Sequence, residues 1–231
     1  MLQSLGKLFR SLKEDIQQFL ASPDWQAAPA EMKTAADNQI ATLEKSGQAA
    51  SALQTGAQAP DFRLEGYDDQ AVQLSSLTAR GPVVLTFFRG QWCPFCNLQL
   101  KTYQRIVDSF KEQGAVLVAV SPQTVEHNRS MNLGAAPDFV LLSDPGNAVA
   151  STYGLTYRIT EELHTAFASL GLQLSAFNGD TSDTLPMAAT YVVDTNGQIA
   201  YHFLSSNHTE RAEPADILAT LKGLNAQKQL I

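Results

Sequence analysis

Residues 83–96 read VVLTFFRGQWCPFC, and this stretch decides the fold. Its first half, residues 83–89, is a nearly continuous apolar run of the kind that forms a buried strand. Beyond it, residues 94–112 repeat apolar side chains at helical spacing. The stretch therefore predicts a strand that leads directly into a helix, with Cys93 and Cys96 at the junction.

Strands and helices continue to alternate outward from this junction. Further strands are predicted at residues 115–121, 138–144, 189–194 and 198–204, and further helices at residues 125–133, 147–153, 161–169 and 215–224. The last two strands flank Asn196-Gly197, which is a strong hairpin signal. This alternation predicts the α/β class, with a central mixed sheet flanked by helices and with the hairpin at one side of it. Residues 160–185 are interpreted as an insertion.

The N-terminal residues 1–50 are interpreted as a helical extension of a domain that spans residues 51–231. Apolar side chains recur at helical spacing in residues 1–20, and a second helix is predicted at residues 30–45. We expect the apolar stripe of the first helix to pack on the body of the protein or on a second subunit, so a homodimer is one expected assembly. A membrane-surface helix is the alternative, and the mixed charge of the polar face argues against it.

The composition limits the class of protein. The chain has 231 residues, of which 44% are hydrophobic and 17% charged, so it can bury a sizeable core. A formal net charge of −7 argues against nucleic acid or an anionic membrane surface as the main partner. No apolar stretch reaches the roughly 18 residues that a membrane span needs, and the N-terminus lacks the features of a signal peptide. We therefore expect a cytoplasmic protein.

The only cysteines in the chain, Cys93 and Cys96, predict redox chemistry. A Cys-x-x-Cys motif within a strand–helix–strand pattern is a redox signature. Unpaired backbone N–H groups and the helix dipole stabilise a thiolate at the start of a helix, and the thiolate is the form that attacks peroxides and disulfides. The spacing also allows the two sulfurs to close a disulfide. We expect the pair to be reachable from solvent, with Arg89 near enough to add positive charge.

Two buried structural thiols, or a zinc site, would also explain the motif. A structural zinc ion usually has four ligands. The four histidines are scattered and none repeats a metal-ligand spacing: His127, His164, His202 and His208. We therefore expect no metal ion, and we favour a redox-active pair over inert thiols.

Five segments together resemble a known family. They are GAQAPDFRL (residues 56–64), VVLTFFRGQWCPFC (83–96), AVLVAVSPQ (115–123), LLSDPGNAVASTYGL (141–155) and ATYVVDTNGQIAYHF (189–203). Over about residues 51–224 the chain resembles the peroxiredoxin-like branch of the thioredoxin superfamily, the alkyl hydroperoxide reductase and thiol-specific antioxidant group. The resemblance implies a thioredoxin-like fold, thiol-dependent reduction of hydroperoxides without a cofactor, and thioredoxin or a similar dithiol as electron donor.

The resemblance also implies roles for individual residues. The peroxide-attacking cysteine of the family falls on Cys96, while the family threonine three residues earlier falls on Cys93 and the family proline seven residues earlier falls on Arg89. The family arginine falls on Ala188. Either Arg89 or Arg211 could supply the missing guanidinium, although the alternative for Arg211 is a solvated residue before the last helix.

A second analogy assigns the attack differently. The segment Trp92-Cys93-Pro94 is similar to the thioredoxin motif, in which the first cysteine attacks and the second resolves. Three hypotheses therefore stay open. The first is a hydroperoxide reductase that attacks through Cys96, and the second is a thiol–disulfide oxidoreductase that attacks a disulfide substrate through Cys93. The third is a redox-switched sensor or interaction protein, motivated by the N-terminal extension.

Overall fold

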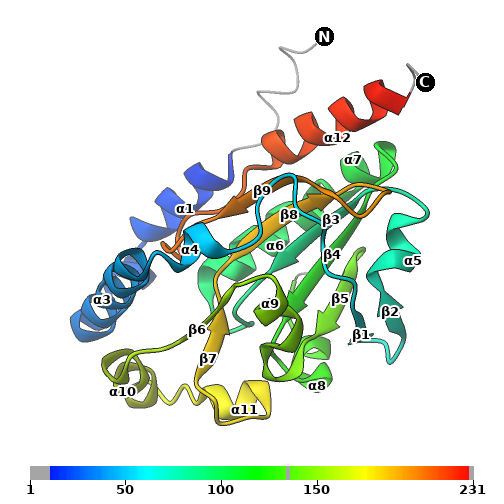
Figure 1. Ribbon diagram of the computed structural model, residues 1–231. Coiled ribbons are helices and arrows are strands. Elements are labelled where there is room, and N and C mark those ends of the chain that lie inside the picture. The colour runs from blue at the N-terminus through cyan, green and yellow to red at the C-terminus, as the bar shows by residue number, and fades with distance from the viewer. Residues whose placement is uncertain (1–10, 134–135, 229–231) are drawn as a thin grey trace.

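A seven-stranded mixed sheet forms the centre of the part of the chain that the structure describes, residues 11–133 and 136–228 of a computed structural model (Figure 1). The strands lie in the order β2-β1-β5-β4-β3-β8-β9. Their bounds are β1 Arg63–Gly66, β2 Ala71–Gln73, β3 Val83–Phe87, β4 Val116–Ser121, β5 Val140–Ser143, β8 Ala189–Val193 and β9 Ile199–Leu204. Strands β3, β4 and β5 are parallel, and β8 runs antiparallel to β3. The predicted α/β class and mixed sheet are confirmed.

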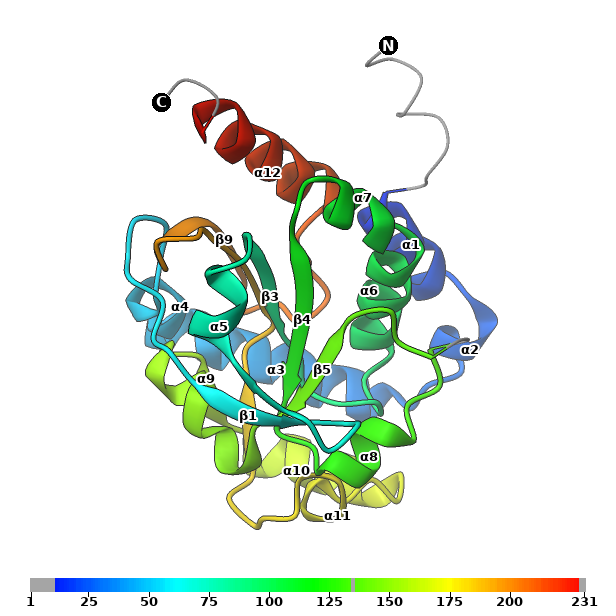
Figure 2. The same cartoon turned by 90° about the vertical axis from the view of Figure 1, so that its right-hand side faces the viewer.

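Helices cover both faces of this sheet, and Figure 2 shows α6 and α7 on one side of β4 with α5 and α9 on the other. The helices of the body are α5 Leu74–Thr78, α6 Pro94–Arg105, α7 Val107–Glu112, α8 Val125–Arg129, α9 Ala148–Thr152, α10 Glu161–Ser169, α11 Leu174–Asn178 and α12 Pro214–Lys228. Because side chains alternate along a strand, Val84 packs in the core under α6, whereas Val83 and Leu85 pack in the core under α5.

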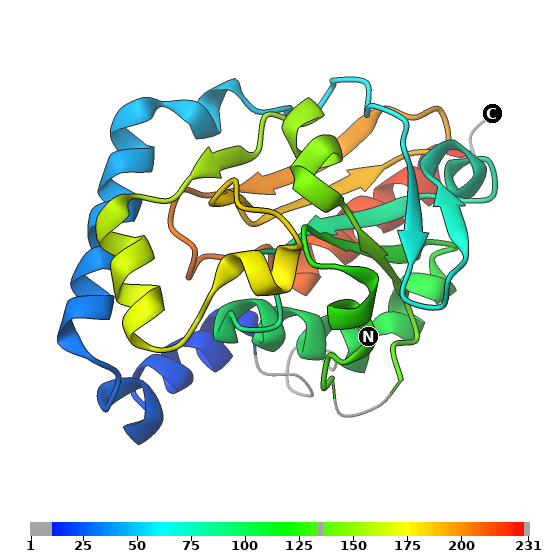
Figure 3. The same cartoon turned by 90° about the horizontal axis from the view of Figure 1, so that it is seen from below.

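The N-terminal helices run along one side of the body (Figure 3). They are α1 Leu12–Leu20, α2 Pro23–Gln26, α3 Ala30–Ser46 and α4 Gln48–Ser51. Helix α1 starts with a capping box made by Ser11 and Glu14, and its Leu12 and Ile16 are buried in the same core as α6. Helix α3 packs against α10. The expectation that the apolar stripe packs on the body is confirmed for α1, while the part of the stripe in residues 1–10 lies outside the described residues.

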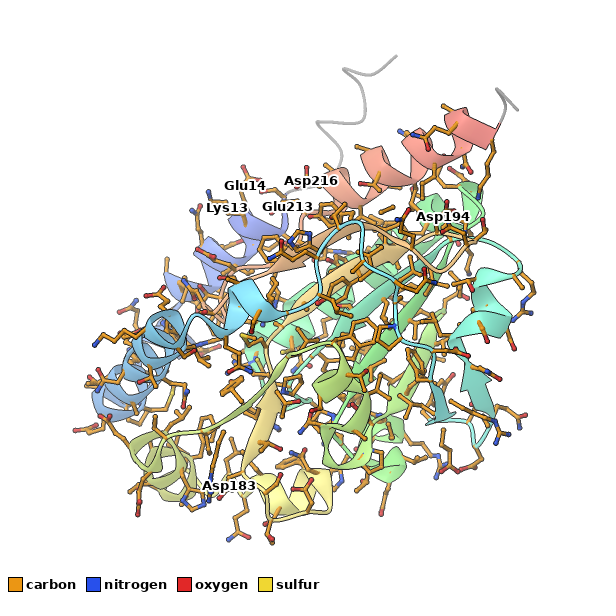
Figure 4. All side chains as sticks on the ribbon, viewed as in Figure 1. Lys13, Glu14, Asp183, Asp194, Glu213 and Asp216 are labelled. Carbon is orange, nitrogen blue, oxygen red and sulfur yellow. The ribbon has the colours of Figure 1, made fainter. Side chains whose placement is uncertain are left out.

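The start of α1 is fastened to the start of α12 (Figure 4). The Glu213 carboxylate accepts hydrogen bonds from the backbone N–H groups of Leu12, at 3.1 Å, and Lys13, at 2.7 Å. These are orphan donors of the first turn of α1, and a carboxylate there also interacts favourably with the helix dipole. A residue far along the chain therefore caps the N-terminal extension.

Among the described residues, none of the helices is both long and apolar enough to cross a bilayer.

One part of the predicted element order was wrong. The helix expected over residues 94–112 is two helices, because Ile106 leaves the helical conformation at φ −118°, ψ 9° and its N–H bonds to the carbonyl of Tyr103 instead. In the segment interpreted as an insertion, residues 160–185, the helix predicted at 161–169 is present as α10. Two elements were not predicted there: α11, and β7 Thr184–Pro186, which pairs with β6 Thr156–Arg158 in a separate two-stranded sheet. Strands of three residues are too short to show a periodic pattern.

Gly81 offers a test of how tightly the start of β3 is packed. A Cβ at this position would lie 2.1 Å from the carbonyl oxygen of Gly114, a backbone atom. We expect Gly81→Ala to lower the free energy of unfolding by about 1–3 kcal/mol, as overpacked sites do. Gly223→Ala is the matched control, because nothing lies within 4 Å of that Cβ and an alanine inside α12 should add about 0.5–1 kcal/mol. Urea denaturation measures both, and equal midpoints for the two variants would contradict the packing described.

Candidate active site

The Cys-x-x-Cys motif lies where β3 passes into α6, as predicted. Cys93 is the N-cap residue, Pro94 occupies the first helical position, and Cys96 lies in the first turn. The turn before the helix is closed by a hydrogen bond from the N–H of Cys93 to the carbonyl of Gly90, at 3.1 Å. Gly90 has φ 149°, and a Cβ there would lie 2.5 Å from Nε1 of Trp92. The turn therefore requires glycine at this position.

The expectation that the pair is reachable from solvent is wrong for this structure. Both cysteines are fully buried and carry free thiols. Phe95, which stands between them, is covered by Phe19 of α1 at a ring distance of 5.6 Å and by Trp25 of α2 at 5.2 Å. His208 lies against Phe95 at 5.4 Å. The N-terminal helices thus cover the first turn of α6, which the periodicity of their sequence could not indicate.

Two arginines contact the sulfurs, one from the turn directly after β3 and the other from the segment before α12. Nη2 of Arg89 donates to Sγ of Cys93 at 3.0 Å, and Nη2 of Arg211 donates to Sγ of Cys96 at 3.6 Å. Their exposed fractions are only 5% and 6%, so the interpretation of Arg211 as a solvated residue is wrong. The Arg89 guanidinium also stacks on the ring of Trp92 at 5.4 Å. The structure therefore brings all the residues singled out from the sequence into one cluster.

The two thiols differ in acidity. Burial disfavours the Cys96 thiolate, but the hydrogen bond from the Cys93 thiol, both guanidinium groups and the backbone N–H of Arg89 outweigh burial and hold the pKa of Cys96 well below its ordinary value. Burial, and its role as donor to Cys96, raise the pKa of Cys93 well above its ordinary value despite the nearby Arg89. The two thiols titrate as a pair, and the lowered pKa of Cys96 places the charge that remains after the first proton leaves on that sulfur.

Among the residues that the structure describes, no carboxylate forms an ion pair with Arg89 or Arg211. Within residues 11–133 and 136–228, the ion pairs of arginine with aspartate or glutamate involve other arginines. His208 does not add to the positive charge, because burial and the two arginines hold its pKa well below the ordinary value and keep it neutral. A buried charge needs a partner, so the thiolate is the anion that offsets this positive cluster.

A buried polar network fixes the segment that carries Arg211. The Tyr103 hydroxyl donates to the carbonyl of Ala212 at 2.9 Å, and the Gln99 amide donates to the Tyr103 oxygen at 3.1 Å. Gln99 also donates to the hydroxyls of Thr86 and Thr190 on β3 and β8. Sequence reasoning missed this network, although a glutamine and a tyrosine on the apolar side of α6 were a signal that polar partners are buried there.

The donor set does not resemble a metal centre. In the described part of the chain no group of three or more histidine, cysteine, aspartate and glutamate residues is placed to hold a metal ion. The groups around the sulfurs are guanidinium and amide donors, which suit an anion.

Comparison with known proteins decides the family. The model of the AhpC/TSA family matches residues 55–202. The chain belongs to this family. The AhpC/TSA match includes Arg89 and both cysteines, but it ends before Arg211 and begins after the N-terminal helices. The second guanidinium and the cover over the cysteines therefore come from outside the matched region.

Relatives and solved structures agree with the AhpC/TSA assignment. "Peroxiredoxin Q, chloroplastic" from Oryza sativa subsp. japonica is 29% identical over 168 residues, covering 72% of this chain and 67% of the relative. "Putative peroxiredoxin bcp" from Helicobacter pylori is 32% identical over 101 residues, covering 44% and 66%. The structure of Peroxidoxin BcpB from Mycobacterium tuberculosis superposes with a TM-score of 0.57 at 23% identity, covering 74% of this chain and 98% of that one. These likenesses confirm the thioredoxin-like fold.

Removing one guanidinium should show what holds the thiolate. We expect Arg211→Met to raise the lower thiol pKa of the pair by about one pH unit or more, because an opposite charge next to the sulfur is lost and the burial remains. The pH dependence of the thiolate ultraviolet absorbance measures this pKa. Arg63→Met removes an exposed arginine from β1, at the far side of the sheet, and should leave the titration unchanged. Coincident titrations of Arg211→Met and the native protein would contradict the assigned role.

Proposed function

We propose that this protein reduces hydroperoxides with the Cys93–Cys96 pair and is recycled by thioredoxin or a similar dithiol. One observation carries the proposal. The Cys96 sulfur accepts hydrogen bonds from three donors: the Cys93 thiol, the backbone N–H of Arg89 and the Arg211 guanidinium. These donors favour an ionised nucleophile, and membership of the AhpC/TSA family supports a peroxide as its target.

The first half of the reaction oxidises one sulfur. The Cys96 thiolate attacks the terminal oxygen of the hydroperoxide, so that an S–O bond forms, the O–O bond breaks and Cys96 becomes a sulfenic acid. The other oxygen leaves as hydroxide or alkoxide and takes a proton from water. The guanidinium groups of Arg89 and Arg211 face the place where this negative charge develops, as electrostatic stabilisation requires.

The second half closes and reopens a disulfide. The Cys93 thiol condenses with the sulfenic acid of Cys96, which forms the S–S bond and releases water. Cys93 already donates a hydrogen bond to Cys96, so the two sulfurs need no rearrangement of distant segments to meet. An external dithiol then supplies two electrons and two protons through a mixed disulfide.

The cytoplasmic location, the homodimer and the domain boundary near residue 50 stay predictions from the sequence.

A second candidate function uses Cys93 as the nucleophile of a thiol–disulfide oxidoreductase. The observation that favours it is the short contact from Arg89 to Cys93, at 3.0 Å. The raised pKa of Cys93 and its complete burial argue against it, because such an enzyme must present a thiolate to a protein disulfide.

Single-cysteine variants separate the two functions. We expect Cys93→Ser to consume about one equivalent of hydrogen peroxide and to accumulate a sulfenic acid that dimedone traps, but not to turn over with a dithiol. Cys96→Ser should not consume peroxide. Peroxide consumption and insulin reduction are measured side by side. Sulfenic acid on Cys93 in the Cys96→Ser variant would overturn the choice of Cys96 as the attacking residue. Insulin reduction without peroxide turnover would support the second function instead.

A further inference from the structure

A small pocket lies beside Arg89, the arginine whose guanidinium contacts Cys93. Two of its walls come from the region that the AhpC/TSA family matches: Tyr157 of β6 and the 187–188 segment before β8. A third wall is the loop at 205–208, which carries His208 and lies just beyond that region. The fourth wall is the N-terminal extension, because Gln39, Ile40 and Leu43 of α3 close it. The extension therefore lines the space next to the guanidinium that contacts Cys93.

The chemistry of the pocket suits a small, oxygen-rich molecule. Arg89 is almost fully buried, and its Nε has no hydrogen-bond partner among the described residues. Tyr157 lines the same pocket and interacts electrostatically with the guanidinium. Ser205 and Ser206 add polar atoms on one side, while Leu43 and Met187 make the opposite side apolar. A buried N–H without an acceptor is an unmet donor, which an oxygen atom of a ligand can satisfy.

Three side chains set the size of the pocket. Ala188 leaves space at the position where the resemblance places the longer family arginine. Leu43 of α3 and Met187 then close the space, so that about 10 Å³ remains, room for about one water molecule. Helix α3 is held in this place because the Gln39 side chain accepts a hydrogen bond from the N–H of Thr160, at 2.7 Å.

We propose that this pocket is the entry for the hydroperoxide and that helix α3 of the N-terminal extension sets its size limit, so that hydrogen peroxide is preferred over bulky alkyl hydroperoxides. The inference rests on the proposed function for the identity of the substrate. Leu43, Ile40 and Met187 are then specificity residues that contact the organic part of the substrate, and Arg89 is the donor that meets its oxygen. The aromatic cover of Phe19 and Trp25 stays closed during entry.

Enlarging the pocket tests the size limit. We expect Leu43→Ala to raise the ratio of kcat/KM for cumene hydroperoxide to kcat/KM for hydrogen peroxide by about tenfold or more, since one added or removed methylene in an apolar pocket changes discrimination by about 10–200-fold. Ile40→Ala, at a half-buried position, is the milder variant and should shift the ratio in the same direction. The matched control is Leu163→Ala, because Leu163 of α10 is buried in the same core as Leu43 but does not line the pocket.

A second readout does not depend on peroxide turnover. The rates of thiol alkylation by N-ethylmaleimide and by the larger N-(1-pyrenyl)maleimide are compared in each variant. In Leu43→Ala we expect the rate with the larger reagent to rise about tenfold more than the rate with the smaller one. In Leu163→Ala we expect little change with either reagent. Equal ratios in the two leucine variants would overturn the proposal. A rise in Trp25→Ala but not in Leu43→Ala would also overturn it, and would place the entry under α2. If the two leucine variants show the expected alkylation rates but the native protein reduces no peroxide, the proposed function is overturned and the entry route is retained.

Discussion

Two buried guanidinium groups that share one thiolate are the constraint on which the rest of the structure depends. Arg89 and Arg211 are removed from water and have no carboxylate partner within the described part of the chain, and the negative charge that offsets them is held on Cys96. Oxidation to the disulfide removes that charge and leaves both guanidinium groups uncompensated in a medium of low dielectric. The cluster therefore stabilises the reduced, dithiol form of the pair. The Cys93–Cys96 disulfide is then easily reduced, so that it acts as a strong oxidant of an incoming dithiol.

The N-terminal extension takes part in holding this cluster. The residues that follow Arg211 are held at two points. The Tyr103 hydroxyl donates to the Ala212 carbonyl, and the Glu213 carboxylate accepts from the first turn of α1. Helix α1 in turn places Phe19 on Phe95, the residue between the two cysteines. The family match ends before Arg211 and starts after α3. The chain thus replaces a guanidinium expected at position 188 by one that depends on its own additional segment.

The sequence was sufficient for the features that local patterns encode. The strand-to-helix junction at residues 83–96 and the Asn196-Gly197 hairpin depend on neighbouring residues, and both are where the pattern predicted them. Arg211 lies 115 positions from Cys96, and the preceding loop gives no periodic signal of burial. Only the resemblance made Arg211 a candidate for the missing guanidinium, and no local pattern could choose between it and Arg89. Burial of the cysteines was missed for the same reason: a stripe of apolar residues shows that a helix packs, but it does not show on which surface.

The two halves of the proposed cycle make opposite demands on this burial. A hydroperoxide is small enough to approach Arg89 through a pocket bounded by α3, and exclusion of bulk water strengthens the electrostatic effect of both guanidinium groups. A dithiol on another protein has no such route, because an S–S bond is attacked along its axis by a sulfur that must enter from outside. Reduction therefore requires the first turn of α6 to move out from under Phe19 and Trp25, and loss of the thiolate charge on oxidation weakens the arginine contacts that hold this turn in place.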